Sequence, residues 1–185
     1  SACGYLKRLF RYAFQIQKGL IFLPGQYRST ALRKEVLAEL QAGLTLTFLQ
    51  HGKVRKLSKD ETTYSYDPEE TGVPTMILTY KACSAYKHQD GWKDIITKRE
   101  FLRVDPIEVV GPLCPGSVVR HVAFNTDTKL EDMPALILPL YFALVGCLTL
   151  PINRGVGVLI VPDVQDLSSF VVARPLMTPL SIREC

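Results

Sequence analysis

The sequence is poor in cysteine, and its cysteines form no recognisable pair. Five are spread along 185 residues, at Cys3, Cys83, Cys114, Cys147 and Cys185. An odd number without a C-x-x-C spacing argues against a disulfide framework and against a zinc ribbon, so a reducing cytoplasm is the expected location. The sequence also lacks a signal peptide, and it starts at Ser1 without a methionine, which predicts a fragment of a longer protein.

The motifs of common enzyme classes are absent too. There is no G-x-S-x-G, no P-loop and no dinucleotide fingerprint. The three histidines, His51, His88 and His121, have no closely spaced ligand partner, whereas zinc sites normally show at least one such pair. The acidic pairs Glu69-Glu70 and Glu131-Asp132 stand in polar turns, where solvation explains them. The sequence therefore offers no catalytic residue, no metal and no cofactor.

A long hydrophobic span is missing as well. The charge-free run Ala135–Ile152 covers 18 residues, which is close to the lower limit for a transmembrane helix. Prolines at 134, 139 and 151 interrupt it, and a proline inside a helix costs about 3 kcal/mol. Two buried strands, or a short helix and a strand, fit this run better, and we expect no contact with a membrane.

What the sequence does have is a sizeable apolar fraction and an uneven charge. Hydrophobic residues make up 47%, enough for a packed core and too many for a disordered chain. Residues 1–103 hold 17 Lys and Arg against 10 Asp and Glu, while residues 104–185 hold 5 against 8. A surface that binds a polyanion shows this asymmetry, although a solvated surface of mixed charge shows it too.

Helical periodicity dominates the first 50 residues. Apolar residues at three- and four-residue spacing predict a helix from Tyr5 to about Lys18, ended by Gly19. A second helix is predicted from Thr30, as its N-cap, to about Gln50.

Strand patterns follow a polar loop that we predict over residues 58–73. Four segments rich in β-branched and aromatic residues come after it, at residues 74–82, 99–111, 116–124 and 156–162. The last is a continuous apolar run of the kind found in a buried central strand, and Asp163 then caps a late helix. The prediction is one α+β region over residues 1–185, with N-terminal helices, a mixed β-sheet and a late helix.

Two segments combine basic and aromatic residues in a way that suits nucleic acid. In "FLQHGKVRKL", residues 48–57, a positive cluster follows the second helix, and the helix dipole accounts for one or two of its charges but not for all. In "AYKHQDGWKDIITKR", residues 85–99, aromatic, basic and amide side chains alternate. Basic groups neutralise phosphates, amides read base edges and an aromatic ring wedges at a base step. The alternative is that the aromatics pack in the core and the lysines are solvated.

Four stretches together resemble a known family: "FLQHGKVRKL", "YKHQDGWK", "PGSVVRHVAF" and "VGVLIVPDVQDLSSF". In this order they are similar to the large subunit of type I CRISPR Cascade surveillance complexes, in the I-B-like (MYXAN) branch that CRISPR-associated transposons also use. The resemblance covers roughly residues 5–180. It implies a non-enzymatic, cytoplasmic subunit that contacts the guide handle and the target-flanking motif (PAM) and helps R-loop formation, while base pairing reads the target.

The resemblance also implies partners, and the chemistry of the side chains and their position within the matching stretches suggest the site residues. The partners are guide RNA (crRNA), target double-stranded DNA, other Cascade subunits, and either a helicase-nuclease or a transposon targeting protein. Phosphate contacts are expected from Lys53, Arg55 and Lys56, and a wedge from Trp92. The candidates for reading the motif or the handle are His51, Lys87, His88, Gln89 and Arg120. Lys93 and His121 complete the predicted set of nucleic-acid-binding residues.

Two alternatives stay open at this point. One is a protein–protein scaffold without direct DNA readout, and the other is a Cys/His hydrolase or nuclease. The sequence separates neither RNA handle from target DNA nor defence from transposition.

Overall fold

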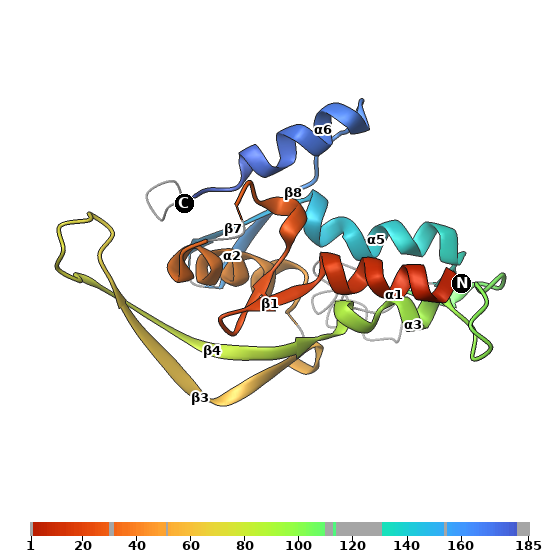
Figure 1. Cartoon of the computed structure of the whole chain (residues 1–185), viewed down its shortest axis with the longest axis horizontal. Coiled ribbons are helices and arrows are strands. Elements are labelled where there is room, and N and C mark those ends of the chain that lie inside the picture. The colour runs from red at the N-terminus through yellow and green to blue at the C-terminus, as the bar shows by residue number, and fades with distance from the viewer. Residues whose placement is uncertain are drawn as a thin grey trace.

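The computed structural model describes residues 2–29, 32–50, 52–109, 113, 131–153 and 155–180. Within them the chain is α+β, as predicted, with helices first and strand pairs later (Figure 1). The predicted strand at 116–124, the proposed N-cap Thr30, and the site candidates His51, Arg120 and His121 lie outside the described residues.

The first helix, α1, spans Ala2–Ala13 and buries one face through Cys3, Leu6, Phe10 and Ala13. It ends before the predicted Lys18, because β1 (Gln15–Gln17) leaves the helical path and pairs antiparallel with β2 (Leu20–Phe22). Gly19, predicted to end the helix, sits instead in the tight turn between these strands with φ 76°. The spacing of apolar residues along the chain does not predict this pairing of β1 with β2.

The second helix, α2, spans Lys34–Thr47 and is buried on most of its surface. It begins four residues after the predicted Thr30, with Arg33 in extended conformation at its N-cap. Gly43 allows close contact with a later strand, because a Cβ built there would lie 2.7 Å from the carbonyl oxygen of Thr149. α2 is therefore a central element of the core.

A long hairpin follows, made of β3 (Arg55–Tyr66) and β4 (Met76–Tyr86), and it extends away from the helices (Figure 1). The predicted polar loop over 58–73 is wrong for residues 58–66, which belong to β3. Much of the hairpin is solvent-exposed, so its strands carry polar side chains where a buried strand would carry apolar ones. The turn itself is capped by the carboxylate of Asp67, which accepts hydrogen bonds from the backbone of Glu69 and Gly72.

Short elements then lead back to the body of the protein. They are the 3₁₀ turn η3 (Lys87–Asp90), α3 (Trp92–Ile95), β5 (Ile107–Glu108), β6 (Glu131–Asp132) and α5 (Pro134–Gly146). The prediction of a short helix and a strand for the charge-free run 135–152 is confirmed, since α5 is followed by strand β7 (Leu148–Asn153). No helix in the described part of the chain is long and apolar enough to cross a membrane.

The C-terminal part is a hairpin and a helix. β7 pairs antiparallel with β8 (Val156–Ile160), and α6 spans Leu167–Ala173. β8 is not the buried central strand that was predicted, because both of its ends are exposed. The cap of α6 is Asp166 rather than Asp163, and its carboxylate accepts from the backbone of Ser168 and Ser169.

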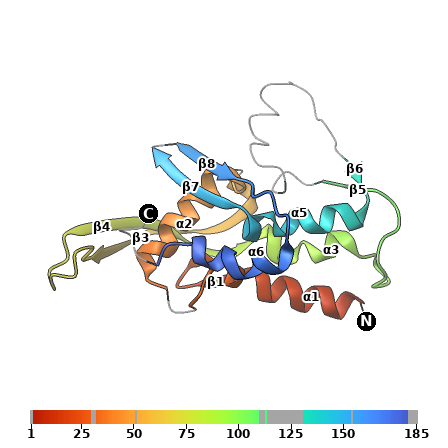
Figure 2. The ribbon, with the colours of Figure 1, turned by 90° about the horizontal axis from the view of Figure 1, so that it is seen from above.

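The described strands thus form four separate antiparallel pairs instead of one mixed sheet. An aromatic core joins α1 and α5, which run side by side in Figure 1 and lie on either side of α3 in Figure 2. Phe10 of α1 meets Tyr141 and Phe142 of α5 edge-on, with ring centroids 5.3 Å apart in both pairs. Buried Arg174 ties the C-terminal segment to the end of α5 by donating to the carbonyl oxygens of Gly146 and Cys147.

Candidate nucleic-acid interface

A groove of about 500 Å³ lies at the base of the β3–β4 hairpin, and we call it the basic groove. It is lined by Lys53, Val54, Arg55, Lys56, Ala85, Tyr86, Lys87, Asp90, Lys93 and Asp94. Five of these residues are basic and two are acidic. Both sequence segments that suit nucleic acid therefore contribute to one concave surface.

The antiparallel hairpin explains why these segments meet. β3 begins where β4 ends, so Arg55 is paired with Tyr86 and Lys56 with Ala85. The residues after Tyr86 then turn directly into η3 and α3, which place Lys87 and Lys93 on the same groove.

Arg55 connects the groove to the core. Its guanidinium donates through Nη1 to Oγ1 of Thr45 on α2, at 2.7 Å. The side chain is half-buried, and burial lowers the pKa of Arg55 from its ordinary value. Arg55 therefore fixes the hairpin to α2 as well as adding positive charge at the groove.

The lysines of the groove differ in their surroundings. Lys53, Lys56 and Lys87 are exposed at its wall. Lys93 is paired with Asp90, with Nζ and Oδ1 3.0 Å apart. Since that carboxylate already offsets its charge, Lys93 has less positive field to offer a phosphate than Lys56 or Lys87.

Trp92 is half-buried beside the groove and lies between two lysines. The Nζ atoms of Lys7 and Lys93 are each 5.7 Å from its ring centroid. Its indole packs against the core cluster, so it does not project as a wedge. Lys7 was missed from the sequence, although α1 carries Lys7, Arg8 and Arg11 and no acidic residue, which is a visible signal.

The prediction that His88 contacts nucleic acid is wrong in this structure. Its ring is fully buried, and the centroids of Phe14, Tyr141 and Tyr86 lie 5.6, 5.8 and 6.1 Å from it. Burial lowers the pKa of His88 to about 3, so the ring is neutral at neutral pH. Neither ring nitrogen has a hydrogen-bond partner among the described residues. The residue belongs to the aromatic core.

Gln89 is likewise a structural residue. Its Nε2 donates to the carbonyl oxygen of Phe14 at 3.1 Å, and its Oε1 accepts from the backbone of Tyr86 at 3.3 Å. Both ends of the amide are thus occupied, and the prediction that it reads a base edge is corrected. The 3₁₀ turn η3 directs Gln89 and its neighbour His88 inward, which their basic sequence context does not reveal.

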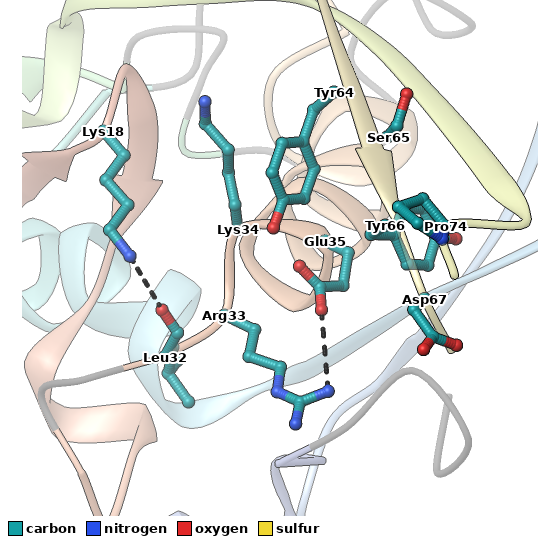
Figure 3. Close-up of a pocket in the computed structure, with 10 residues that line it drawn as sticks. All are labelled: Lys18, Leu32, Arg33, Lys34, Glu35, Tyr64, Ser65, Tyr66, Asp67 and Pro74. Carbon is teal, nitrogen blue, oxygen red and sulfur yellow. Dashed lines mark hydrogen bonds and ion pairs between the residues drawn. The ribbon is translucent and has the colours of Figure 1, made fainter. Parts of the chain in front are cut away.

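A second hollow, the α2 pocket, has a volume of about 650 Å³ (Figure 3). It is lined by Lys18, Leu32, Arg33, Lys34, Glu35, Tyr64, Ser65, Tyr66, Asp67 and Pro74. The far end of β3 and the N-terminus of α2 form its walls. No motif in the sequence marks it.

Among the residues that the structure describes, the geometry gives no support to a thiol or metal chemistry. Cys3, Cys83 and Cys147 are buried, and burial raises the pKa of the Cys83 and Cys147 thiols, whereas an activated nucleophile needs a lowered pKa. In the part of the chain that the structure describes, no cluster of three or more metal-ligating side chains is found.

Comparison with known proteins adds two findings. A family model described as the DevT N-terminal domain matches residues 1–141. "CRISPR-associated protein Cas8a1/Csx13" of Myxococcus xanthus (strain DK1622) is 31% identical over 184 residues, which cover 97% of this chain and 30% of that protein. The chain therefore spans less than a third of the length of this relative.

Proposed function

The chain belongs to the DevT N-terminal domain family, and from that premise we propose that it acts within the large subunit of a CRISPR Cascade complex. In this role it binds nucleic acid without catalysing a reaction. It contacts the crRNA handle and the flanking motif of the target duplex, and it helps the duplex open for guide pairing. The name of the Myxococcus relative and the basic groove support the proposal.

The observation that carries it is the convergence of two segments on the basic groove. Residues 53–56 lie at the start of the β3–β4 hairpin and residues 87–93 directly after its end, and together they line one concave surface with five basic side chains. A groove with excess positive charge attracts a phosphate backbone. A fraying helix end would account for charges in one segment only.

The residues have different roles in this proposal. Lys53, Lys56 and Lys87 supply phosphate contacts, because all three residues are exposed and line the groove. Arg55 holds the hairpin on α2 and adds charge from a half-buried position. Trp92 supplies a lysine-flanked aromatic surface rather than a wedge.

The test is a binding selection with the reconstituted guide-RNA complex, in the presence and absence of this chain. The duplexes carry a randomised flank beside a target matched to the guide. We expect a short flanking motif to be enriched only when the chain is present. Equal binding and equal flank preference without the chain would overturn the proposal.

A scaffold function is the second candidate, and exposed apolar residues at the C-terminal end favour it. On α6, Leu167, Val171 and Val172 are 69%, 63% and 70% exposed. Such a surface suits a protein partner, for example another Cascade subunit. A scaffold predicts that binding to the complex depends little on salt, whereas phosphate contacts predict a steep dependence of affinity on salt concentration.

A further inference from the structure

The α2 pocket has the size of a nucleotide site and lies apart from the basic groove. The groove is lined by the first residues of β3, and the pocket by its last residues, Tyr64–Tyr66, together with the start of α2. Its volume of about 650 Å³ falls within the range of small-molecule sites. Figure 3 shows side chains around this hollow from the turn after β1, the segment leading into α2, the end of β3 and Pro74 before β4.

The first unusual feature is a carboxylate with few partners. Glu35 is only 4% exposed. Its oxygen Oε1 lies 3.9 Å from Nη1 of Arg33, which is too long for a hydrogen bond, and Oε2 has no hydrogen-bond partner in the described part of the chain. A buried charged acceptor without donors is costly, so this position favours a ligand that presents N–H groups.

The second feature is an aromatic wall. The rings of Tyr64 and Tyr66 are nearly parallel, with an interplanar angle of 9° and centroids 6.2 Å apart. The ammonium of Lys34 lies 5.1 Å from the Tyr64 centroid and 5.5 Å from the Tyr80 centroid, which holds these rings in place. Flat aromatic rings of this kind are the surfaces on which unpaired bases stack.

The third feature is the charge around the pocket. Three cations, Lys18, Arg33 and Lys34, line it against two carboxylates, Glu35 and Asp67. The carboxylate of Asp67 is already engaged by backbone N–H groups of the hairpin turn. Arg33 is ion-paired with Glu70, so Lys18 and Lys34 are the cations that attract a phosphate and disfavour an arginine or lysine side chain from a protein partner.

From these three features we propose that the α2 pocket binds an unpaired guanine of a single-stranded nucleic acid. Guanine presents N1–H and the 2-amino group side by side, and a carboxylate accepts from both. Adenine and cytosine place a ring acceptor beside their amino group, which the second carboxylate oxygen would repel. Tyr64 stacks on the base, and Lys18 attracts its phosphate. This site extends the proposed nucleic-acid binding but does not depend on the groove.

The test measures fluorescence anisotropy of labelled oligouridines that carry one central guanosine, inosine or adenosine, titrated with the whole chain. We expect the guanosine oligomer to bind about tenfold more tightly than the adenosine oligomer, with inosine between them because it lacks the 2-amino group. Absence of a guanosine preference overturns the inference, and this comparison needs no protein variant. A second result would also overturn the inference. It is that the chain binds an arginine-containing peptide, shows no guanosine preference, and loses the peptide in the Glu35→Gln variant.

Matched variants then locate the site. Glu35→Gln should abolish the guanosine preference, while Glu39→Gln, one turn further along α2, should keep it. The groove variant Lys56→Ala/Lys87→Ala should weaken binding of flanked duplexes and leave the guanosine preference intact, so the two proposals fail separately. Loss of the preference in the groove variant would place the base in the groove and refute the pocket. The guanosine oligomer is also compared as RNA and as DNA. Tighter binding of the RNA oligomer identifies guide RNA as the source of the guanine, and tighter binding of the DNA oligomer identifies a displaced DNA strand.

Discussion

The basic groove and the α2 pocket occupy opposite ends of the same strand, β3, and they are built on different physical grounds. The groove has excess positive charge on exposed side chains, so it suits a backbone of phosphates at many positions. The pocket combines a buried carboxylate with aromatic rings, so it suits one base with defined donors. Charge that recurs in the sequence predicted the groove, whereas the pocket depends on the burial of Glu35, which no local pattern indicates.

The largest effect that we expect separates groove lysines from other lysines. Lys53→Ala/Lys56→Ala/Lys87→Ala should weaken duplex binding by the complex by roughly 1 kcal/mol for each phosphate contact, and should make the salt dependence shallower by about one unit of slope per lysine. Binding would be measured as a salt titration.

The control for this variant removes the same charge outside the groove. Lys59→Ala/Lys81→Ala/Lys98→Ala should lower affinity much less and leave most of the slope in place. Equal losses in the two triple variants would mean that net charge, and not the groove, determines binding.

The second effect tests whether His88 is a core residue. Its pKa falls from the ordinary 6.5 to about 3 on folding, so the unfolded state binds the proton first. Above pH 6.5 the neutral, buried His88 imposes no penalty on folding. As the pH falls from 6.5 towards 3, the free energy of unfolding decreases. We expect His88 to cost about 1.5 kcal/mol of unfolding free energy between pH 6.5 and 5.

Denaturant unfolding at several pH values would measure this loss, and His88→Phe, a ring of similar shape without a titrating group, should remove most of it. If His88→Phe leaves the pH profile unchanged but abolishes duplex binding, the histidine is a binding residue after all.

A third effect, of about the same size, concerns Gln89. Gln89→Ala removes the hydrogen bonds to Phe14 and Tyr86, so we expect a loss of about 1 to 2 kcal/mol in unfolding free energy. The affinity of the folded protein for duplexes should stay unchanged. A base-specific change in flank preference, with normal stability, would restore Gln89 as a reader of the motif.

The smallest effect comes from the acidic side of the groove. Asp90→Asn removes the ion pair with Lys93 and raises the positive charge of the groove, so duplex affinity should increase about two- to threefold at low salt, since exposed ion pairs are worth about 0 to 1 kcal/mol. Asp60→Asn, on the exposed part of β3, is the matched control. An equal gain from both variants would show a general charge effect.

Several features of the fold could be predicted from the sequence, and others could not. The apolar face of α1 and the late helix α6 follow from local periodicity, and the helix-and-strand alternative for the charge-free run follows from its prolines. The strand at 58–66 was missed, because a hairpin exposed to solvent carries polar side chains on β3. The hairpin of β1 and β2 was missed because its pairing overrides the helical pattern before it.

The candidate site divides in the same way. Lys53, Lys56 and Lys87 could be selected from sequence because charge on a solvated surface is a local property. The inward orientation of His88 and Gln89 could not be predicted, because their partners Phe14 and Tyr141 lie far away in the chain.

The sequence by itself thus determined the fold class, the excess positive charge of the first half, and the basic segments that make nucleic-acid binding the leading proposal. The tertiary structure decided which of those side chains face solvent together and which are enclosed. The physical reason is that periodicity and charge are written in neighbouring residues, whereas burial depends on elements brought together by folding. The pairing of β3 with β4 and the turn into η3 and α3 create the basic groove, and the approach of the end of β3 to the start of α2 creates the α2 pocket.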